Sequence, residues 1–309
     1  MVGAVQHVRK TNHISISEKA PQNPNRTPLR SGPVTVKIGP QTHRSSAISA
    51  SNAETILVRG RDLASELIGQ VSFTDYFWLL LTGTMPSAAQ RRLLDATLVA
   101  IAEHGLVPSV VASRMTLAAA PEALQGAVAA GILGCGSVVL GSAESAGGFF
   151  AQVAQRAEQG TALQDAAAAV VRQYRSERRA IPGYGHPLHK GHDPRALRLF
   201  EVAAEAGLAG RHVEIALVVE RALPDLVGKA LSLNVSGAIA AVLLDAGYPL
   251  PALKGIPILA RAGGLIAHLL EEQEKPIGFV LSHAAAAAIS YDGPSPAGFQ
   301  PSDEPADGA

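Results

Sequence analysis

The chain has 309 residues, 47% of them hydrophobic, and its 26 basic and 26 acidic side chains cancel to a formal net charge of zero. This balance excludes a strong general attraction to nucleic acid or to an anionic membrane surface. A single cysteine, Cys135, can form neither an internal disulfide nor a Cys-based metal cage. We therefore expect a cytoplasmic protein without a metal site, built as one large domain with a smaller lobe.

The N-terminal part predicts little regular structure. Residues 1–30 contain no apolar segment of the signal-peptide kind and are rich in Asn, Pro, Ser and Lys, so they are expected to be a disordered leader. Two short β-branched runs follow, at residues 34–39 and 55–59. Their flanking Gly, Pro and polar residues predict a small hairpin or two isolated strands.

Almost all of the later sequence has helical length and spacing. Helices are predicted over residues 73–81, 88–104, 121–140, 149–159, 163–179, 194–206, 213–221, 236–246 and 257–274, with Gly or Pro sites between several of them. Strands are too few for a doubly wound sheet, so the predicted fold class is mainly α. Residues 293–309 contain four prolines and are expected to be a disordered tail.

The segment Ala123–Ala143 has no charged residue and is long enough to cross a hydrocarbon core. Its glycines dilute the hydrophobicity, so we interpret it as a helix packed tightly between other helices rather than as a membrane span. Such a helix can also pack across a subunit boundary, and we predict a homodimer or a dimer-based oligomer.

The densest concentration of polar groups lies in one loop, from Ile181 to Arg195, which holds three histidines and three glycines. Glycines let backbone N–H groups approach a ligand closely. A histidine such as His186 can donate to a carbonyl oxygen, and Arg195 at a helix start can bind a carboxylate. A purely structural connection is the alternative, and the crowding of these residues argues against it.

The sequence Pro-Gly-Tyr-Gly-His followed by Asp-Pro-Arg, with Arg195 nine positions after His186, resembles the signature loop of citrate synthases. This resemblance implies that His186 polarises a keto-acid carbonyl, that Arg195 binds a carboxylate, and that coenzyme A (CoA) lies against the loop backbone. The CoA-binding residues would then be Pro182, Gly183, Tyr184 and Gly185. It also implies a citrate synthase-like fold, with a large helical domain at residues 31–148 and 247–292 and a smaller helical lobe at residues 149–246.

Two further segments are similar to the same family. Residues 102–105 resemble its Ala-Asp-His segment, which implies that His104 contacts the keto acid, although a histidine at a helix end is commonly a simple capping contact. Residues 260–272 resemble an active-site helix of the family, which makes Arg261 a carboxylate-binding residue. His268 shares its helix face and is more typical of a packed interior position. Lys275 partly matches an arginine that the family lends to the neighbouring subunit.

Two positions depart from the family pattern. The family's catalytic aspartate is replaced by Ser236, whose hydroxyl cannot act as a carboxylate base and can instead be the N-cap of the next helix. A histidine that hydrogen-bonds the thioester enol is replaced by Gly141. Glu144, in the same turn, is a candidate relocated catalytic carboxylate, and a solvated or N-capping role is the alternative.

Three functions remain open. The first, suggested by similarity to the short citryl-CoA lyase branch of the family, is cleavage of citryl-CoA or a relative to acetyl-CoA and oxaloacetate, or the reverse condensation. The second is an acyltransferase or lyase that uses another acyl-CoA, with Glu144 or His186 as acid or base. The third is a non-catalytic protein that binds CoA and a di- or tricarboxylate. In each case CoA is a substrate or ligand, and no tightly bound cofactor is expected.

A basic cluster precedes the loop and consists of Arg172, Arg175, Arg178 and Arg179. These side chains could meet the phosphates of CoA. A solvated helix end is the simpler interpretation.

Overall fold

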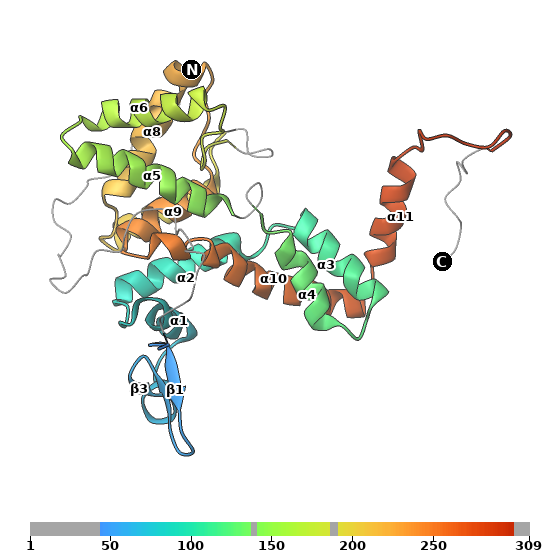
Figure 1. Ribbon diagram of the computed structural model, residues 1–309, viewed down its shortest axis with the longest axis horizontal. Helices are drawn as coiled ribbons and strands as arrows, with labels where there is room; N and C mark the ends of the chain where they lie inside the picture. Colours follow the sequence, from blue (N-terminus) through green and yellow to red (C-terminus); the bar gives the residue numbers. More distant parts are fainter. Residues whose placement is uncertain (1–43, 137–140, 186–190, 300–309) are drawn as a thin grey trace, which may run out of the picture.

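The computed structural model describes residues 44–136, 141–185 and 191–299, and this part of the chain is mainly helical, as the sequence predicts (Figure 1). Three short strands come first, followed by a π-helical turn: β1 (Ser49–Ser51), β2 (Ile56–Val58), β3 (Arg61–Asp62) and η1 (Leu63–Leu67). The later elements are α1 (Phe73–Thr82), α2 (Ala88–Ala102), α3 (Pro108–Ala119), α4 (Leu124–Leu133), α5 (Ser142–Glu158), α6 (Leu163–Ser176), α7 (Pro194–Glu205), α8 (Arg211–Val227), α9 (Val235–Asp245), the 3₁₀ turn η2 (Leu250–Ala252), α10 (Gly255–Glu274) and α11 (Gly278–Ala288).

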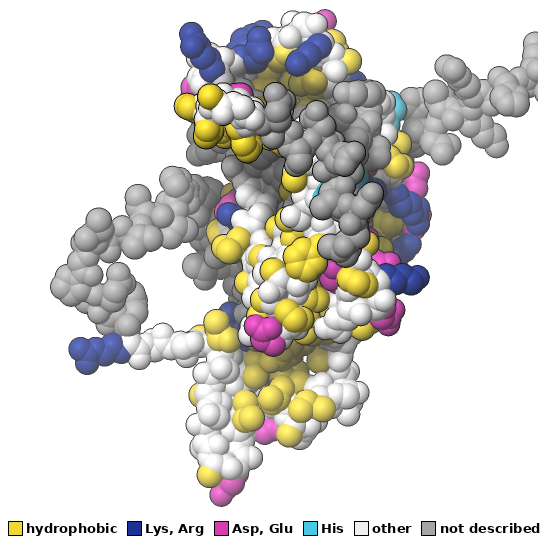
Figure 2. Space-filling model, turned by 90° about the vertical axis from the view of Figure 1, so that its right-hand side faces the viewer, with side chains coloured by type: hydrophobic (Ala, Val, Ile, Leu, Met, Phe, Trp, Pro, Cys, Tyr) yellow, Lys and Arg dark blue, Asp and Glu magenta, His cyan; other side chains and the backbone are white. Residues whose placement is uncertain are grey.

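The strands form a small antiparallel sheet in the order β1-β2-β3 at one end of the molecule. The contact between this sheet and α1 buries Val58, Leu67 and Leu79. Figure 2 shows hydrophobic side chains gathered at this end, where Ile68 and Phe73 are among the exposed apolar residues. The strand predicted over residues 55–59 is confirmed, because β2 spans Ile56–Val58. The leader and the run at 34–39 lie outside the described residues.

The main hydrophobic core lies among α2, α5, α6, α7, α8 and α9. Phe149 and Phe150 of α5 are fully buried, and their rings meet Tyr174 and Tyr184 edge-on. Within α9, residues 237–243 are all buried. Because α9 is packed on several sides, its first turn has a fixed position, and the loop from residue 181 lies against that turn.

A second group of helices packs around α10, which crosses α2, α3 and α4, while α3 also contacts α11. A β-carbon at Gly131 of α4 would lie 2.6 Å from Leu265 of α10 and 2.9 Å from the Ser109 carbonyl oxygen of α3. Only glycine lets these three helices approach so closely. The tight packing predicted for the glycine-rich segment is thus confirmed at this position, within one chain.

Several helix boundaries differ from the prediction. The helix predicted over residues 121–140 ends at Leu133, whereas the one predicted from residue 149 begins at Ser142. No helix was predicted at α3, which starts with Pro108 at its first helical position, where proline needs no N–H. Nor was a helix predicted at α11, which contains an alanine run of strong helix formers.

One helical stretch in the described part of the chain, Leu250–Glu274, is long and apolar enough to span a membrane by length and composition alone. It includes α10, which packs against three other helices, as core helices of this composition do. The division into a large domain and a small lobe stays a prediction.

Candidate active site

The loop that begins at Ile181 is held against the start of α9. Gly183 and Gly185 have φ angles of +89° and +83°, which favour glycine. The Asn234 N–H donates to the Gly183 carbonyl at 2.9 Å, and the Asn234 side-chain amide donates to the Gly185 carbonyl at 2.8 Å. The loop backbone is therefore fixed up to residue 185. His186, the predicted catalytic residue, lies outside the described residues.

Two glycines meet where this loop touches α9. A β-carbon at Gly183 would lie 2.9 Å from the Gly237 Cα, and one at Gly237 would lie 2.7 Å from the Gly183 carbonyl oxygen. Neither position can therefore carry a side chain without moving the loop. Sequence reasoning singled out Gly183 but missed Gly237, whose only signal is a glycine in the first turn of an apolar helix.

The side chain of Tyr184 points away from the proposed ligand site. It is buried, its hydroxyl donates to the Ala216 carbonyl at 2.8 Å, and burial together with the charge of Glu220 raises its pKa well above the ordinary value. Only the backbone of Tyr184 is available for CoA, and half-buried Pro182 precedes it in the loop. CoA binding by residues 182–185 stays a prediction.

Asp193 organises the second half of the site, although sequence reasoning gave it no role. Its carboxylate accepts Nε and Nη2 of Arg195, each at 3.0 Å, and also caps α7 by accepting the Arg195 N–H. It accepts the Val235 N–H of α9 at 2.9 Å as well. Burial would raise the pKa of Asp193, but Arg195 and these N–H groups lower it below its ordinary value. Arg195 is thus held in a fixed orientation, with Nη1 left outside the pairing with Asp193.

Arg261 is the largest fully buried side chain in the described part of the molecule, with 2% of its surface exposed. Its Nε and Nη1 have no hydrogen-bond partner among the described residues. The carboxylate of Glu103 approaches Nη1 only to 4.0 Å. Burial lowers the pKa of Arg261, and the positive charge of Arg195 lowers it further. Two unsatisfied donors on a buried guanidinium beside a second cation make Arg261 a candidate anion-binding residue.

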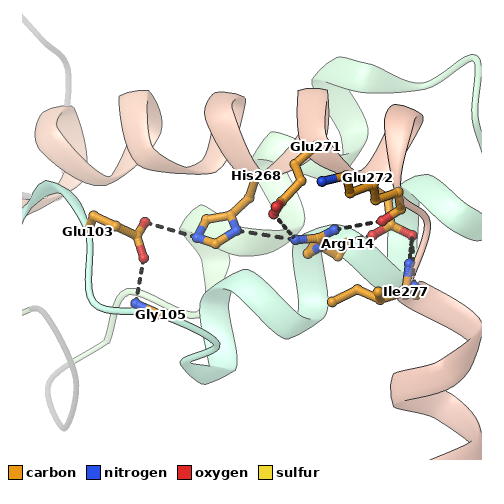
Figure 3. Close-up of polar contacts among 9 residues, drawn as sticks. Glu103, Gly105, Arg114, His268, Glu271, Glu272 and Ile277 are labelled. Atoms are coloured by element: carbon orange, nitrogen blue, oxygen red, sulfur yellow. Dashed lines mark hydrogen bonds and ion pairs between the residues drawn. The ribbon is translucent and has the colours of Figure 1, made fainter.

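A chain of polar contacts runs from Glu103, beside this arginine, to the far end of α10 (Figure 3). His268 Nε2 lies 3.0 Å from Glu103, and its Nδ1 faces Nη1 of Arg114 at 3.5 Å. Arg114 is buried and donates to Glu272 at 2.6 Å and to Glu271 at 2.7 Å. His268 is therefore a half-buried network member, and sequence reasoning missed both Arg114 and Glu272.

Glu272 joins this network to α11. It is buried and accepts the N–H groups of Ile277 and Gly278 at 2.9 and 2.7 Å, so it caps a helix that has no side-chain cap at its own N-cap position. Burial would raise the pKa of Glu272, but Arg114 and the two N–H groups lower it below the ordinary value. Lys275 accepts Arg114 through its carbonyl, and its side chain is exposed.

The remaining predicted site residues lie on α5, on α9 and just after α2. His104 is half-buried just after α2, which ends at Ala102, two residues earlier than predicted. Glu144 is exposed in the first turn of α5, whose N-cap is Gly141. Ser236 is not the N-cap of α9, because Asn234 holds that position and accepts the Ser236 N–H.

The basic cluster at the end of α6 is exposed. Arg179 lies 4.0 Å over the Tyr174 ring and pairs with Glu177, so its charge has partners within the chain. Figure 2 shows Lys and Arg side chains at the end of the molecule where α6 and α8 lie. Over the described ranges, no three His, Cys, Asp or Glu side chains converge where they could hold a metal ion.

Comparison with known proteins identifies a matching family and several similar structures. Residues 86–278 match the family model described as citrate synthase, C-terminal domain. The structure is similar to that of citryl-CoA lyase from Hydrogenobacter thermophilus, with a TM-score of 0.72, 31% identity, and coverage of 83% of this chain and 97% of that one.

Two more distant relatives extend the comparison. ATP citrate lyase from Methanothrix soehngenii, solved in complex with citrate and coenzyme A, is 23% identical with a TM-score of 0.65, over 86% of this chain and 44% of that one. Citrate/2-methylcitrate synthase from Bacillus subtilis is 27% identical over 206 residues, which are 65% of this chain and 53% of the relative. The chain thus spans about half the length of the curated relatives it matches.

Proposed function

The chain belongs to the citrate synthase family, and we propose that it acts on the CoA thioester of a hydroxy-polycarboxylate, cleaving citryl-CoA to acetyl-CoA and oxaloacetate or catalysing the reverse condensation. The observation that carries this proposal is the buried guanidinium of Arg261, unpaired at Nε and Nη1, beside Arg195. Two neighbouring cations in a largely buried site suit a ligand with two or more carboxylates.

Each proposed contact follows from the geometry or the resemblance. Arg261 binds one carboxylate through Nε and Nη1, and Arg195, oriented by Asp193, binds another through Nη1. His104 contacts the keto-acid portion, and the backbone of residues 182–185 lies along CoA. The arginines add no proton-transfer chemistry, because a guanidinium stays protonated at neutral pH.

The same residues can serve cleavage and the reverse condensation. In cleavage, the tertiary hydroxyl loses its proton, the carbon–carbon bond breaks, and the electron pair forms a thioester enolate that takes up a proton to give acetyl-CoA. His186 is the proposed base for the hydroxyl, and Glu144 is the proposed replacement for the missing acid. Condensation follows the same steps in reverse, so the Glu144 carboxylate would be the base for the acetyl methyl group, because the hydroxyl of Ser236 has too high a pKa for that role.

The direct experiment supplies the purified chain with citryl-CoA and follows acetyl-CoA and oxaloacetate by chromatography. We expect both products in equal amounts, with the rate abolished by Arg261→Met. Binding of citryl-CoA without turnover would overturn the lyase proposal. In the opposite direction, the double variant Ser236→Asp/Gly141→His should raise citrate formation from acetyl-CoA and oxaloacetate, because it restores both absent groups.

A second candidate, a non-catalytic protein that binds CoA and a di- or tricarboxylate, is favoured by the same two departures. Ser236 is held by the Asn234 cap, and Gly141 offers no side chain at all. Calorimetry with CoA, oxaloacetate and citrate separates the candidates, since this one predicts tight binding of the ligands and no turnover of citryl-CoA.

We also propose that the protein is a cytoplasmic homodimer or a dimer-based oligomer. Support comes from exposed apolar side chains on two adjacent helices, Ile266 and Leu270 on α10 and Phe279 and Val280 on α11. A second copy covering them would remove this surface from water and bring Lys275 close to the partner. Sedimentation at micromolar concentration should give twice the chain mass or a multiple of it, and a monomer alone would contradict the proposal.

A further inference from the structure

Glu103 lies at the surface beside the buried Arg261, in what we call the Arg261 pocket. Its side chain is 48% exposed, whereas that of Arg261 is 2% exposed, and Oε2 of Glu103 lies 4.0 Å from Nη1 of Arg261. This separation is too long for a hydrogen bond. A carboxylate therefore lies within Coulomb range of the buried cation without occupying its donors.

Other donors hold Glu103 away from Arg261. Oε1 accepts the N–H groups of His104, at 2.8 Å, and Gly105, while Oε2 accepts Nε2 of His268 at 3.0 Å. The other ring nitrogen of His268 faces Arg114, which can only donate. Nδ1 must then accept, and the Nε2 proton is directed at Glu103. Both carboxylate oxygens are thus satisfied by groups other than Arg261.

The backbone of α10 makes room for this arrangement at Gly264, three residues after Arg261 and four before His268. A β-carbon at Gly264 would collide with the Ala102 carbonyl oxygen and would lie 3.2 Å from Oε2 of Glu103. A side chain there would displace the carboxylate from its place between the arginine and the histidine. The fold itself therefore positions Glu103.

We infer that Glu103 is a specificity-determining residue that limits the negative charge of the ligand accepted by the Arg261 pocket. The inference rests on the proposed function of this site. Arg195 is already balanced by Asp193, and Glu103 offsets much of the field of Arg261, so each further ligand charge is opposed by a nearby carboxylate.

This charge limit has a chemical meaning for the proposed substrate. In citryl-CoA one carboxyl group of citrate is a thioester, so the citryl portion carries two charges, whereas free citrate carries three. Oxaloacetate also carries two. Glu103 therefore favours the thioester and the keto acid over free citrate, which can compete for the same two arginines.

The test is calorimetry of the full chain with pyruvate, oxaloacetate and citrate, which carry one, two and three charges at neutral pH, at one fixed ionic strength. Glu103→Gln keeps an oxygen for the two backbone N–H groups and removes the charge. Affinity should rise roughly threefold per ligand charge, so citrate gains roughly ninefold more than pyruvate. The matched control is Glu271→Gln, which removes a carboxylate from Arg114 and should leave the ranking of the three ligands unchanged.

Glu103→Asp provides a second variant, because it keeps the charge but shortens the reach to His268. It should retain the wild-type ranking even if its melting temperature falls. The charge limit would be overturned if Glu103→Gln changed the affinities for all three ligands equally. It would also be overturned if Glu103→Asp shifted the ranking of the ligands in the way expected for Glu103→Gln. The proposed carboxylate site fails separately, if Arg261→Met leaves oxaloacetate and citrate binding unchanged.

Discussion

Two arginines on neighbouring helices, Arg114 of α3 and Arg261 of α10, are buried to the same degree, with 2% of each residue exposed. Arg114 donates to Glu271, Glu272 and the Lys275 carbonyl. Arg261 has two guanidinium nitrogens without a hydrogen-bond partner among the described residues, and Glu103 is 4.0 Å from one of them. Burial is therefore no guide to the role of a charged side chain, but the set of partners is.

The contrast separates an arginine that holds the structure together from one that is kept for a ligand. A fully paired buried cation recovers part of its desolvation cost, because carboxylates and carbonyls replace its water. An unpaired one destabilises the fold and persists where binding requires it. The experiments below remove partners from one arginine or the other and ask whether stability or binding changes.

The largest effect is expected from Glu272→Ala. This change removes the buried carboxylate partner of Arg114, leaving the more exposed Glu271, and removes the acceptor that caps α11. We expect the free energy of unfolding to fall by about 3–5 kcal/mol, as for other broken buried ion pairs. Urea unfolding followed by circular dichroism measures it.

The control for this experiment is Glu201→Ala, which breaks the exposed pair with Arg198 on α7. It should cost less than about 1 kcal/mol. A similarly small loss in Glu272→Ala would mean that the Arg114 network is not the structural counterpart of the Arg261 pocket.

Arg261→Met tests the other side of the comparison. Removing an unpaired buried cation should keep the free energy of unfolding unchanged or raise it by roughly 1 kcal/mol. Affinity for oxaloacetate or citrate should fall by about 2–5 kcal/mol, which is roughly 30-fold or more. Thermal melting and calorimetry on the same sample give both numbers, and a large loss of stability would place Arg261 with Arg114 as a structural residue.

The sequence predicted one of these arginines and not the other, for a physical reason. Arg261 lies in a segment that resembles an active-site helix, whereas Arg114 lies in α3, a helix whose mixed Ser, Thr and Ala composition gives a weak apolar period. Its partners are more than 150 residues away in the chain. Pairing of this kind depends on how helices cross, which no local pattern records.

The same distinction applies to the loop that contacts α9. Gly183 and Gly185 were predicted as glycines whose backbone faces a ligand. Their positive φ angles show that the loop conformation itself favours glycine at both positions. Gly237 and Asp193 were missed, because their importance comes from contacts with segments about 40 to 50 residues distant. Composition and helix periodicity therefore predict the mainly α fold, while the tertiary partners of the site come only from the packed structure.

A smaller effect is expected from Arg195→Ala. Part of the Arg195 charge is already balanced by Asp193, so the loss of carboxylate affinity should be about 1.5–3 kcal/mol, less than for Arg261→Met. Calorimetry with oxaloacetate, citrate and CoA measures it. Unchanged affinities for all three ligands would show that the site does not extend to Arg195.

The smallest expected effect is a loss of stability at acidic pH. The pKa of Glu272 in the folded protein lies below its ordinary value of 4.5, so the stability that this carboxylate contributes is complete above that pH and is lost as pH falls through the lowered pKa. Glu272→Gln retains an acceptor for the two N–H groups of α11 but has no charge at any pH. The difference in free energy of unfolding between wild type and Glu272→Gln should therefore be constant from pH 7 to about pH 5. Below that pH it should shrink, by about 1.4 kcal/mol in total for each pKa unit by which Glu272 differs between the folded and unfolded chains. Urea unfolding midpoints at pH 7, 5, 4 and 3 follow this convergence. A difference that stays constant down to pH 3 would mean that Glu272 acts through its shape and hydrogen bonds alone, and the electrostatic contrast between Arg114 and Arg261 would then have to rest on binding data.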